Sequence, residues 1–183
     1  MPASDELIHL FSYETGVSFE LPLGWEQRHE AAGLAEYGLD PDDDDEQDDD
    51  DGALELDADA RFTVMAVGET ASPDGFLQLA GELARAAGLT ITSERDQQVD
   101  DADVHITVGR ALPTDRAAGG EQLVVQAVAQ RGASLWVLRG SAPVATADRH
   151  RRLFDAAIAS ARFIQLDGGR SWAPTTRPTR RDR

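Results

Sequence analysis

Cysteine and lysine are both absent from the 183 residues. Without cysteine the chain has no disulfide framework, no thiolate metal site and no cysteine nucleophile. No stretch approaches the roughly 18 apolar residues of a membrane span. The first residues also lack the basic region and apolar run of a secretory signal. We therefore expect a cytoplasmic protein that does not insert into a membrane.

Catalytic motifs are missing as well. The four histidines, at positions 9, 29, 105 and 150, include no pair at zinc-ligand spacing. Ser134 lies in G-A-S-L-W, which lacks the second glycine of a nucleophile elbow. No phosphate loop or dinucleotide fingerprint occurs. The sequence thus predicts a non-enzymatic protein without cofactor or metal, and His105, between Val104 and Ile106, is expected to face outward.

The net charge of −17 is concentrated in one segment. Residues 40–59 hold 13 of the 34 acids and none of the 17 arginines, which leaves a charge of about −4 for the rest. Residues 42–51 read D-D-D-D-E-Q-D-D-D-D, a run that repels itself and is predicted to be a disordered insert at about 40–53. An EF-hand alignment on Gly52 fails, because Gln47 and Ala58 take two key ligand positions.

The C-terminal segment has the opposite charge. Residues 167–183 contain five arginines and two prolines without apolar periodicity, so we expect a disordered Arg/Pro-rich tail. Because the chain is acidic overall, nucleic acid is not an expected partner. For the acidic run, three interpretations stay open: a solvated linker, a site for a basic protein partner, and an intramolecular contact with the tail. The candidate partner-binding residues are Asp42, Asp43, Asp44, Asp45, Glu46, Asp48, Asp49, Asp50, Asp51 and Trp136.

The remaining segments predict an α+β domain over residues 1–166. Residues 7–13 and 17–21 alternate apolar and polar side chains and indicate two paired strands, with a turn at Thr15-Gly16 and a core tryptophan at Trp25. Residues 31–37 fit either a strand or a helical turn. Residues 61–67 predict a central strand. Ser72 and Pro73 are expected to cap and begin a helix that stops at Gly88.

The second half of the domain is expected to form a meander and a final helix. Residues 89–95, 104–108, 121–130 and 133–139 predict four strands without intervening helices, which favours an antiparallel sheet. Trp136 and Ser134 would share one face of their strand, opposite Leu135 and Val137. Core packing is the favoured interpretation of Trp136, with an exposed recognition anchor as the alternative. Residues 146–164 predict the second helix.

This order of elements resembles the PsbP-like fold of the Mog-type Ran-binding, LpqN and DcrB/Eag-type proteins. Phe19, Leu21, Pro22, Gly24 and Trp25 carry the resemblance, together with residues 153–163. It implies an α/β/α sandwich, with a central, mainly antiparallel sheet flanked by helices, that binds proteins. The expected function is therefore an adaptor or chaperone for a protein partner. A basic partner and a secretion-related role belong to the same expectation. The alternative is a small-molecule or lipid-binding protein with a pocket between sheet and helix.

Overall fold

The computed structural model of the chain describes residues 7–39, 59–112 and 120–164. Its centre is a seven-stranded antiparallel sheet in the order β3-β4-β5-β9-β8-β7-β6. The strands are β3 (Trp25–Ala31), β4 (Leu34–Leu39), β5 (Arg61–Glu69), β6 (Thr90–Val99), β7 (Ala102–Ala111), β8 (Gln122–Arg131) and β9 (Ser134–Pro143). A second sheet contains β1 (Leu7–Ser12), β2 (Val17–Pro22) and the short β10 (Arg162–Phe163).

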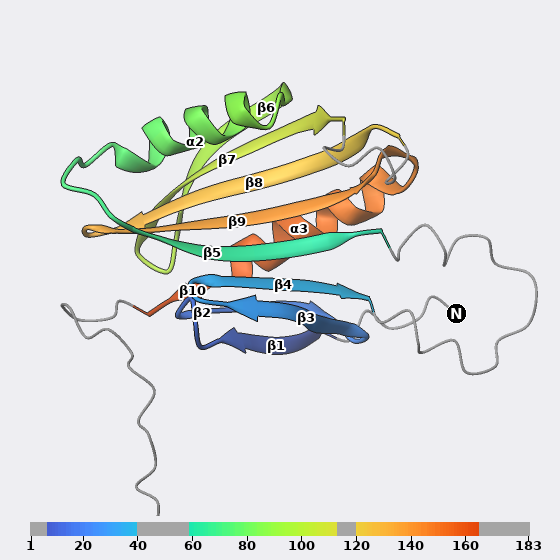
Figure 1. Cartoon of the computed structure of the whole chain (residues 1–183), viewed down its shortest axis with the longest axis horizontal. Coiled ribbons are helices and arrows are strands. Elements are labelled where there is room, and N and C mark those ends of the chain that lie inside the picture. Colours follow the sequence, from blue (N-terminus) through green and yellow to red (C-terminus); the bar gives the residue numbers. More distant parts are fainter. Residues whose placement is uncertain (1–6, 40–58, 113–119, 165–183) are drawn as a thin grey trace, which may run out of the picture.

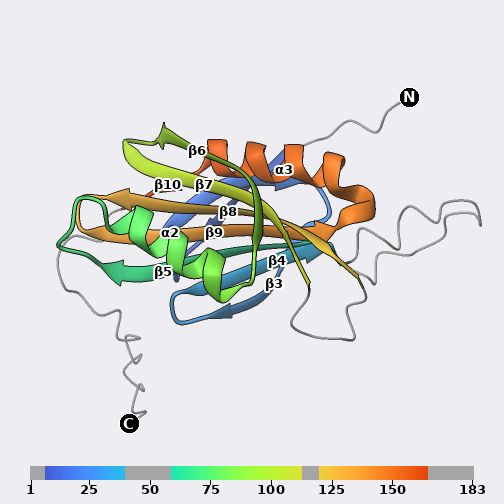
Figure 2. The ribbon, with the colours of Figure 1, turned by 90° about the horizontal axis from the view of Figure 1, so that it is seen from above.

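Two α-helices lie on opposite sides of the large sheet (Figures 1 and 2). Helix α2 (Gly75–Ala86) packs mainly on β8 and β7, whereas α3 (Ala147–Ser160), after the 3-10 turn η1 (Val144–Thr146), packs on β9, β8 and β2. The mainly antiparallel sheet flanked by helices is thus confirmed. The expected α/β/α layering is incomplete, because strands dominate the structure and the small sheet shares one layer with α3.

The side of the sheet that faces α3 carries the main hydrophobic core. Aromatic rings meet there: Phe19 lies 5.0 Å from Tyr37 and 5.1 Å from Phe62, and Phe62 stacks on Phe154 at 6.0 Å. Trp25 meets the Phe154 ring edge-on at 6.3 Å, which confirms its predicted core position. We call this cluster the α3-side core. Burial of apolar surface is the dominant favourable term in folding, and these large rings contribute to it.

The opposite side has a smaller cluster, which we call the α2-side core: Phe76, Ala80, Val128, Leu135 and Val137. Trp136, between Leu135 and Val137, points the other way into the α3-side core. The predicted division of β9 into two faces is therefore confirmed. Both faces are buried here because β9 is the middle strand of the seven.

Several expected elements differ from the structure. Residues 26–30 belong to strand β3, and the open choice at residues 31–37 is settled as strand β4. β3 escaped the pattern analysis because, after Trp25, every residue of this edge strand is exposed and there is no apolar alternation. Its charged side chains also discourage pairing with another sheet edge. β5 is an interior strand, third from one edge, but β9 is the central one.

Both helices are shorter than predicted. α2 begins at Gly75 with Asp74 at the N-cap, whereas the prediction placed its start at Pro73. The difference arises because the side chain that caps the helix is that of Gln130. Its Oε1 accepts from the Phe76 amide at 3.1 Å and its Nε2 donates to the Ser72 carbonyl at 2.9 Å. α3 ends at Ser160, since the chain then turns to pair Phe163 with Val17 in the small sheet.

The predicted acidic insert at about 40–53 and the predicted Arg/Pro-rich tail at 167–183 both lie outside the described residues. The domain boundaries proposed from the sequence therefore stay a prediction. Neither helix in the described part of the chain is long and apolar enough to cross a membrane.

Candidate functional site

The described residues leave part of the sheet face that carries α2 uncovered. α2 lies over β7 and β8, so neither described helix lies above the residues of β4, β5 and the second half of β9 on this side. Met65 and Val67 on the interior strand β5 are 38% and 42% exposed. We call this area the open face. Large apolar side chains on an interior strand usually lie under another layer of structure, so their exposure marks the open face as a candidate contact surface.

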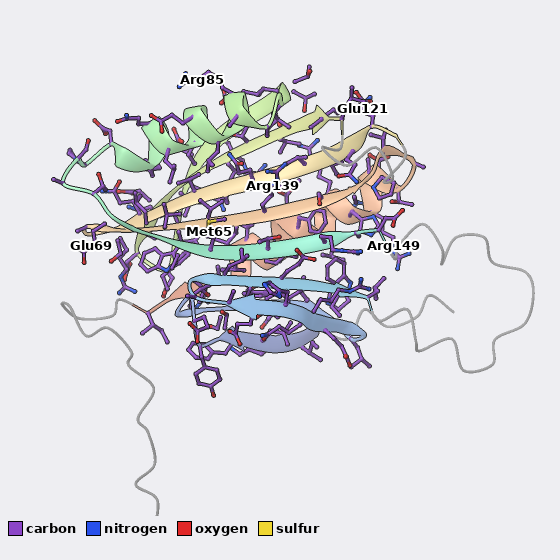
Figure 3. All side chains as sticks on the ribbon, in the orientation of Figure 1. Met65, Glu69, Arg85, Glu121, Arg139 and Arg149 are labelled. Atoms are coloured by element: carbon purple, nitrogen blue, oxygen red, sulfur yellow. The ribbon has the colours of Figure 1, made fainter. Side chains whose placement is uncertain are left out.

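A cavity of about 330 Å³ lies where the open face meets α2. Leu83 of α2 borders it on one side and Met65 of β5 on the other, while its floor includes Gln126, Val137 and Arg139. Figure 3 shows Arg139 and Met65 in the region between α2 and β5. The cavity therefore combines apolar walls with a cationic and an amide side chain, the combination typical of ligand sites.

Arg139 has no ion-pair or hydrogen-bond partner within the described ranges. Burial alone lowers the pKa of its guanidinium, with no carboxylate opposing the shift. Arg61 at the rim differs, because Glu36 lies 3.6 Å away. Burial, followed by Arg28, lowers the pKa of Arg61, and Glu36 acts in the opposite direction. The cavity floor thus holds a partly desolvated positive charge that is not neutralised by the described residues.

Gln126 is next to Arg139 in the sheet. The two residues pair directly across β8 and β9, so their side chains leave the sheet on the same side. Gln126 is 2% exposed, and its Nε2 has no hydrogen-bond partner among the described residues. A buried amide donor without a partner costs free energy, so the site retains a binding capacity that the described structure does not use.

The sequence singled out neither Arg139 nor Gln126. A signal was available in both strands, since Arg139 follows Leu135 and Val137 on one face, and Gln126 lies between Val124 and Val128 on its own face. A polar residue at an apolar-face position of a buried strand is costly. Their adjacency required the register of β8 and β9, and the cavity required the position of α2.

Of the residues that the sequence did predict, only Trp136 lies in the described ranges. It is 4% exposed, its Nε1 donates to the Thr15 carbonyl at 3.0 Å, and its ring lies 5.1 Å from Phe163. These contacts fit the favoured interpretation of core packing and leave no surface for the alternative of an exposed anchor. The acidic residues 42–51 lie outside the described residues, and their role stays a prediction.

His105 lies on the same side of the sheet as the open face, near the opposite edge. Its Nδ1 is 2.6 Å from Asp96 Oδ1 and its Nε2 is 3.4 Å from Glu94 Oε1. The imidazole bridges two carboxylates of the edge strand β6 rather than pointing freely outward. Within the described ranges no group of three or more His, Asp or Glu side chains could hold a metal ion.

Comparisons by structure identify the fold. The structure of cyanobacterial PsbP from Synechocystis sp. PCC 6803 is similar to that of this chain, with a TM-score of 0.57 and 13% identity. The similarity covers 89% of this chain and 95% of the PsbP chain. The chain has the PsbP-like/Mog1 fold. No family model and no curated protein matches the sequence itself.

Two further structures share this PsbP-like fold. The Saccharomyces cerevisiae Ran-binding protein Mog1p is similar over 86% of this chain and 95% of its own, with a TM-score of 0.57 and 10% identity. Mycobacterium tuberculosis LpqN, involved in cell envelope biogenesis, is similar over 86% and 90%, with a TM-score of 0.53 and 14% identity. The predicted resemblance is thus confirmed at the level of the fold, while identities this low leave function to the residues of this chain.

Proposed function

We propose that the chain is a non-enzymatic protein-binding module, an adaptor or chaperone, whose partner docks on the open face. The observation that carries the proposal is the exposure of Met65 and Val67 on the interior strand β5. A partner that covered both side chains would complete the layer that α2 begins. The fold gives general support, because Mog1p, which shares it, is a Ran-binding protein.

The acidic run can contribute to the same interaction. Residues 42–51 follow β4 in the sequence and precede β5, the two strands that carry much of the open face. We propose that these acids contact a basic region of the partner, which would speed association at low salt. An intramolecular contact between the acidic run and the Arg-rich tail would compete with this partner for the same acidic residues. A role in secretion is the proposed context of the chaperone.

The test compares two apolar residues of equal exposure. Met65→Asp places a charge on the open face, and Leu77→Asp, at a position 40% exposed on α2, is the matched control. A partner captured from native lysate by the unaltered chain and identified by mass spectrometry should be lost by Met65→Asp and kept by Leu77→Asp. Equal retention by both variants, with unchanged circular dichroism, would contradict the open face as the docking surface.

A third variant separates the acidic run from the open face. Deletion of residues 42–51 should weaken capture at low salt and have less effect at moderate salt, because exposed charges are screened. Capture that is independent of the deletion would make the acidic run a spacer.

The cavity favours a second candidate function. A volume of about 330 Å³ with apolar walls falls at the lower end of small-molecule sites. The chain would then bind a small molecule or a lipid in a pocket between sheet and helix. Small molecules retained on the purified protein would support this function.

A further inference from the structure

A row of polar residues crosses the seven-stranded sheet beneath and beside α2. The registers pair Glu36 with Thr63, Thr63 with Arg139, Arg139 with Gln126, and Gln126 with Thr107. Directly paired residues project from the same face of a sheet, so the row runs from the open face toward α2. In its middle, Arg139 and Gln126 line the cavity.

Other arginines of the described residues form ion pairs with carboxylates, which Arg139 in the middle of this row does not. Arg95 reaches Asp155 at 2.7 Å, Arg110 reaches Glu121 at 3.3 Å and Arg131 reaches Asp100 at 3.5 Å. Arg139 is partly desolvated, yet no acceptor of the described residues faces it. A guanidinium stays charged under all ordinary conditions. An anion in the cavity would therefore remove an existing electrostatic cost.

The geometry favours a carboxylate. Arg139 offers a planar fork of N–H donors and the adjacent Gln126 offers an unused amide N–H, and the two oxygens of a carboxylate accept from both. Glu36 lies at the rim beside Arg61. Its negative charge disfavours a dianion such as phosphate more than a monoanion. A single positive charge on the floor also matches a single negative charge.

The walls define the rest of the ligand. Met65, Leu83 and Val137 present apolar surface to the cavity. A carboxylate without an apolar group would leave this surface wet, whereas a short hydrocarbon chain would bury it. We propose that the cavity binds a carboxylate that carries an apolar group, with Arg139 and Gln126 as the donors. This chemistry is available from a free amphiphilic acid or from an acidic residue flanked by apolar ones in a docked protein, and the second source rests on the proposed function.

The probe for the site is hexanoate, with hexanamide as its neutral analogue. Titration of the isotopically labelled full chain is followed by the Arg139 side-chain N–H signal and the backbone amides of Thr63 and Gln126. Hexanoate should give saturable shifts, and hexanamide should bind at least about tenfold more weakly, since hydrogen bonds to charged groups are the stronger ones. Equal binding of acid and amide, or no saturable shift, overturns the proposal.

Variants assign the binding to the named donors. Arg139→Met should weaken hexanoate at least about tenfold, and Gln126→Met should weaken it severalfold. Arg85→Met, which alters an exposed arginine of α2, should bind like the unaltered chain. Arg139→Lys keeps the charge and should bind with intermediate affinity. Retained binding in Arg139→Met, or loss in Arg85→Met, overturns the assignment.

Two arms distinguish the source of the carboxylate. Native mass spectrometry of the purified protein should show a retained acid if the ligand is free. If none is retained, the peptide Ac-Leu-Glu-Leu-NH₂ should compete with hexanoate while its glutamine analogue does not. Failure of both arms overturns the proposal, since the site would then bind only the probe. Val67 is on the open face but does not line the cavity. Hexanoate binding that survives Val67→Asp, together with loss of protein capture, would show that the two proposals can be tested separately.

Discussion

The two faces of the large sheet differ in how completely they are covered. On the α3 side, the helix and the small sheet bury a continuous aromatic core around Phe62 and Phe154. On the α2 side, the helix covers β7 and β8 and leaves Met65 and Val67 in contact with water. The half-buried Arg139 and the buried Gln126 lie at the border of the covered area. The comparison indicates that the α3 side supplies stability, which allows the α2 side to keep groups suited to binding.

The largest expected effect comes from removing the ring at the centre of the α3-side core. Phe154→Ala should lower the free energy of unfolding by about 3–5 kcal/mol, because a fully buried ring leaves a cavity. Met65→Ala on the open face should lower it by less than about 1 kcal/mol. Denaturant unfolding of both variants measures the difference. Equal losses would show that the two faces contribute alike.

Two glycines test the packing of the two faces by adding a methyl group, whereas the previous variants remove side-chain atoms. A Cβ at Gly140 would overlap the ring of Phe154, whereas a Cβ at Gly81 in α2 meets no atom of the described residues within 4 Å. Gly140→Ala should therefore destabilise by about 3 kcal/mol. Gly81→Ala should stabilise by about 0.5–1 kcal/mol, because alanine is the better helix former. Thermal unfolding monitored by circular dichroism checks both signs.

The α3-side core also predicts a loss of stability at high pH. Burial, followed by Glu30, raises the pKa of Tyr37 from 10.0 to about 12, with Ser12 opposing the rise. Tyr37 is neutral in both states below pH 10, so its contribution is complete there. Between pH 10 and 12 the unfolded chain loses the proton first, and about 2 kcal/mol of stability is lost.

The control for this pH dependence is Tyr37→Phe, which removes the titrating group. Its free energy of unfolding should fall less than that of the unaltered chain over the same interval. Denaturant unfolding at several pH values between 9 and 12 provides the measurement. Parallel curves for the two proteins would mean that Tyr37 is not the source of the pH dependence.

Local patterns in the sequence predict the strands that bury one face, and long-range contacts decide the rest. The alternation around Trp136 was enough to divide β9 into two faces. Strand β3 and the start of α2 were not predictable locally, since β3 buries only Trp25 and the α2 cap comes from Gln130, more than 50 residues later. The end of α3 depended on the pairing of Phe163 with Val17.

The candidate site was less predictable than the fold. The sequence directed attention to acidic residues 42–51 and to Trp136, both conspicuous in composition. Arg139 and Gln126 are inconspicuous in the sequence, because each is one of several polar residues within a mainly apolar strand. Their importance comes from pairing across two strands and from the place where α2 stops covering the sheet. Neither feature has a local sequence pattern.

The measurement that tests this account most directly is the stability of Arg139→Met together with its hexanoate affinity. If Arg139 is kept for binding at a cost in stability, the variant should unfold at the same or a higher free energy, within about 1 kcal/mol, and should lose hexanoate binding. A variant that is destabilised by several kcal/mol while it still binds hexanoate would contradict the account. Arg139 would then be a structural residue, and the α2 side would serve stability as the α3 side does.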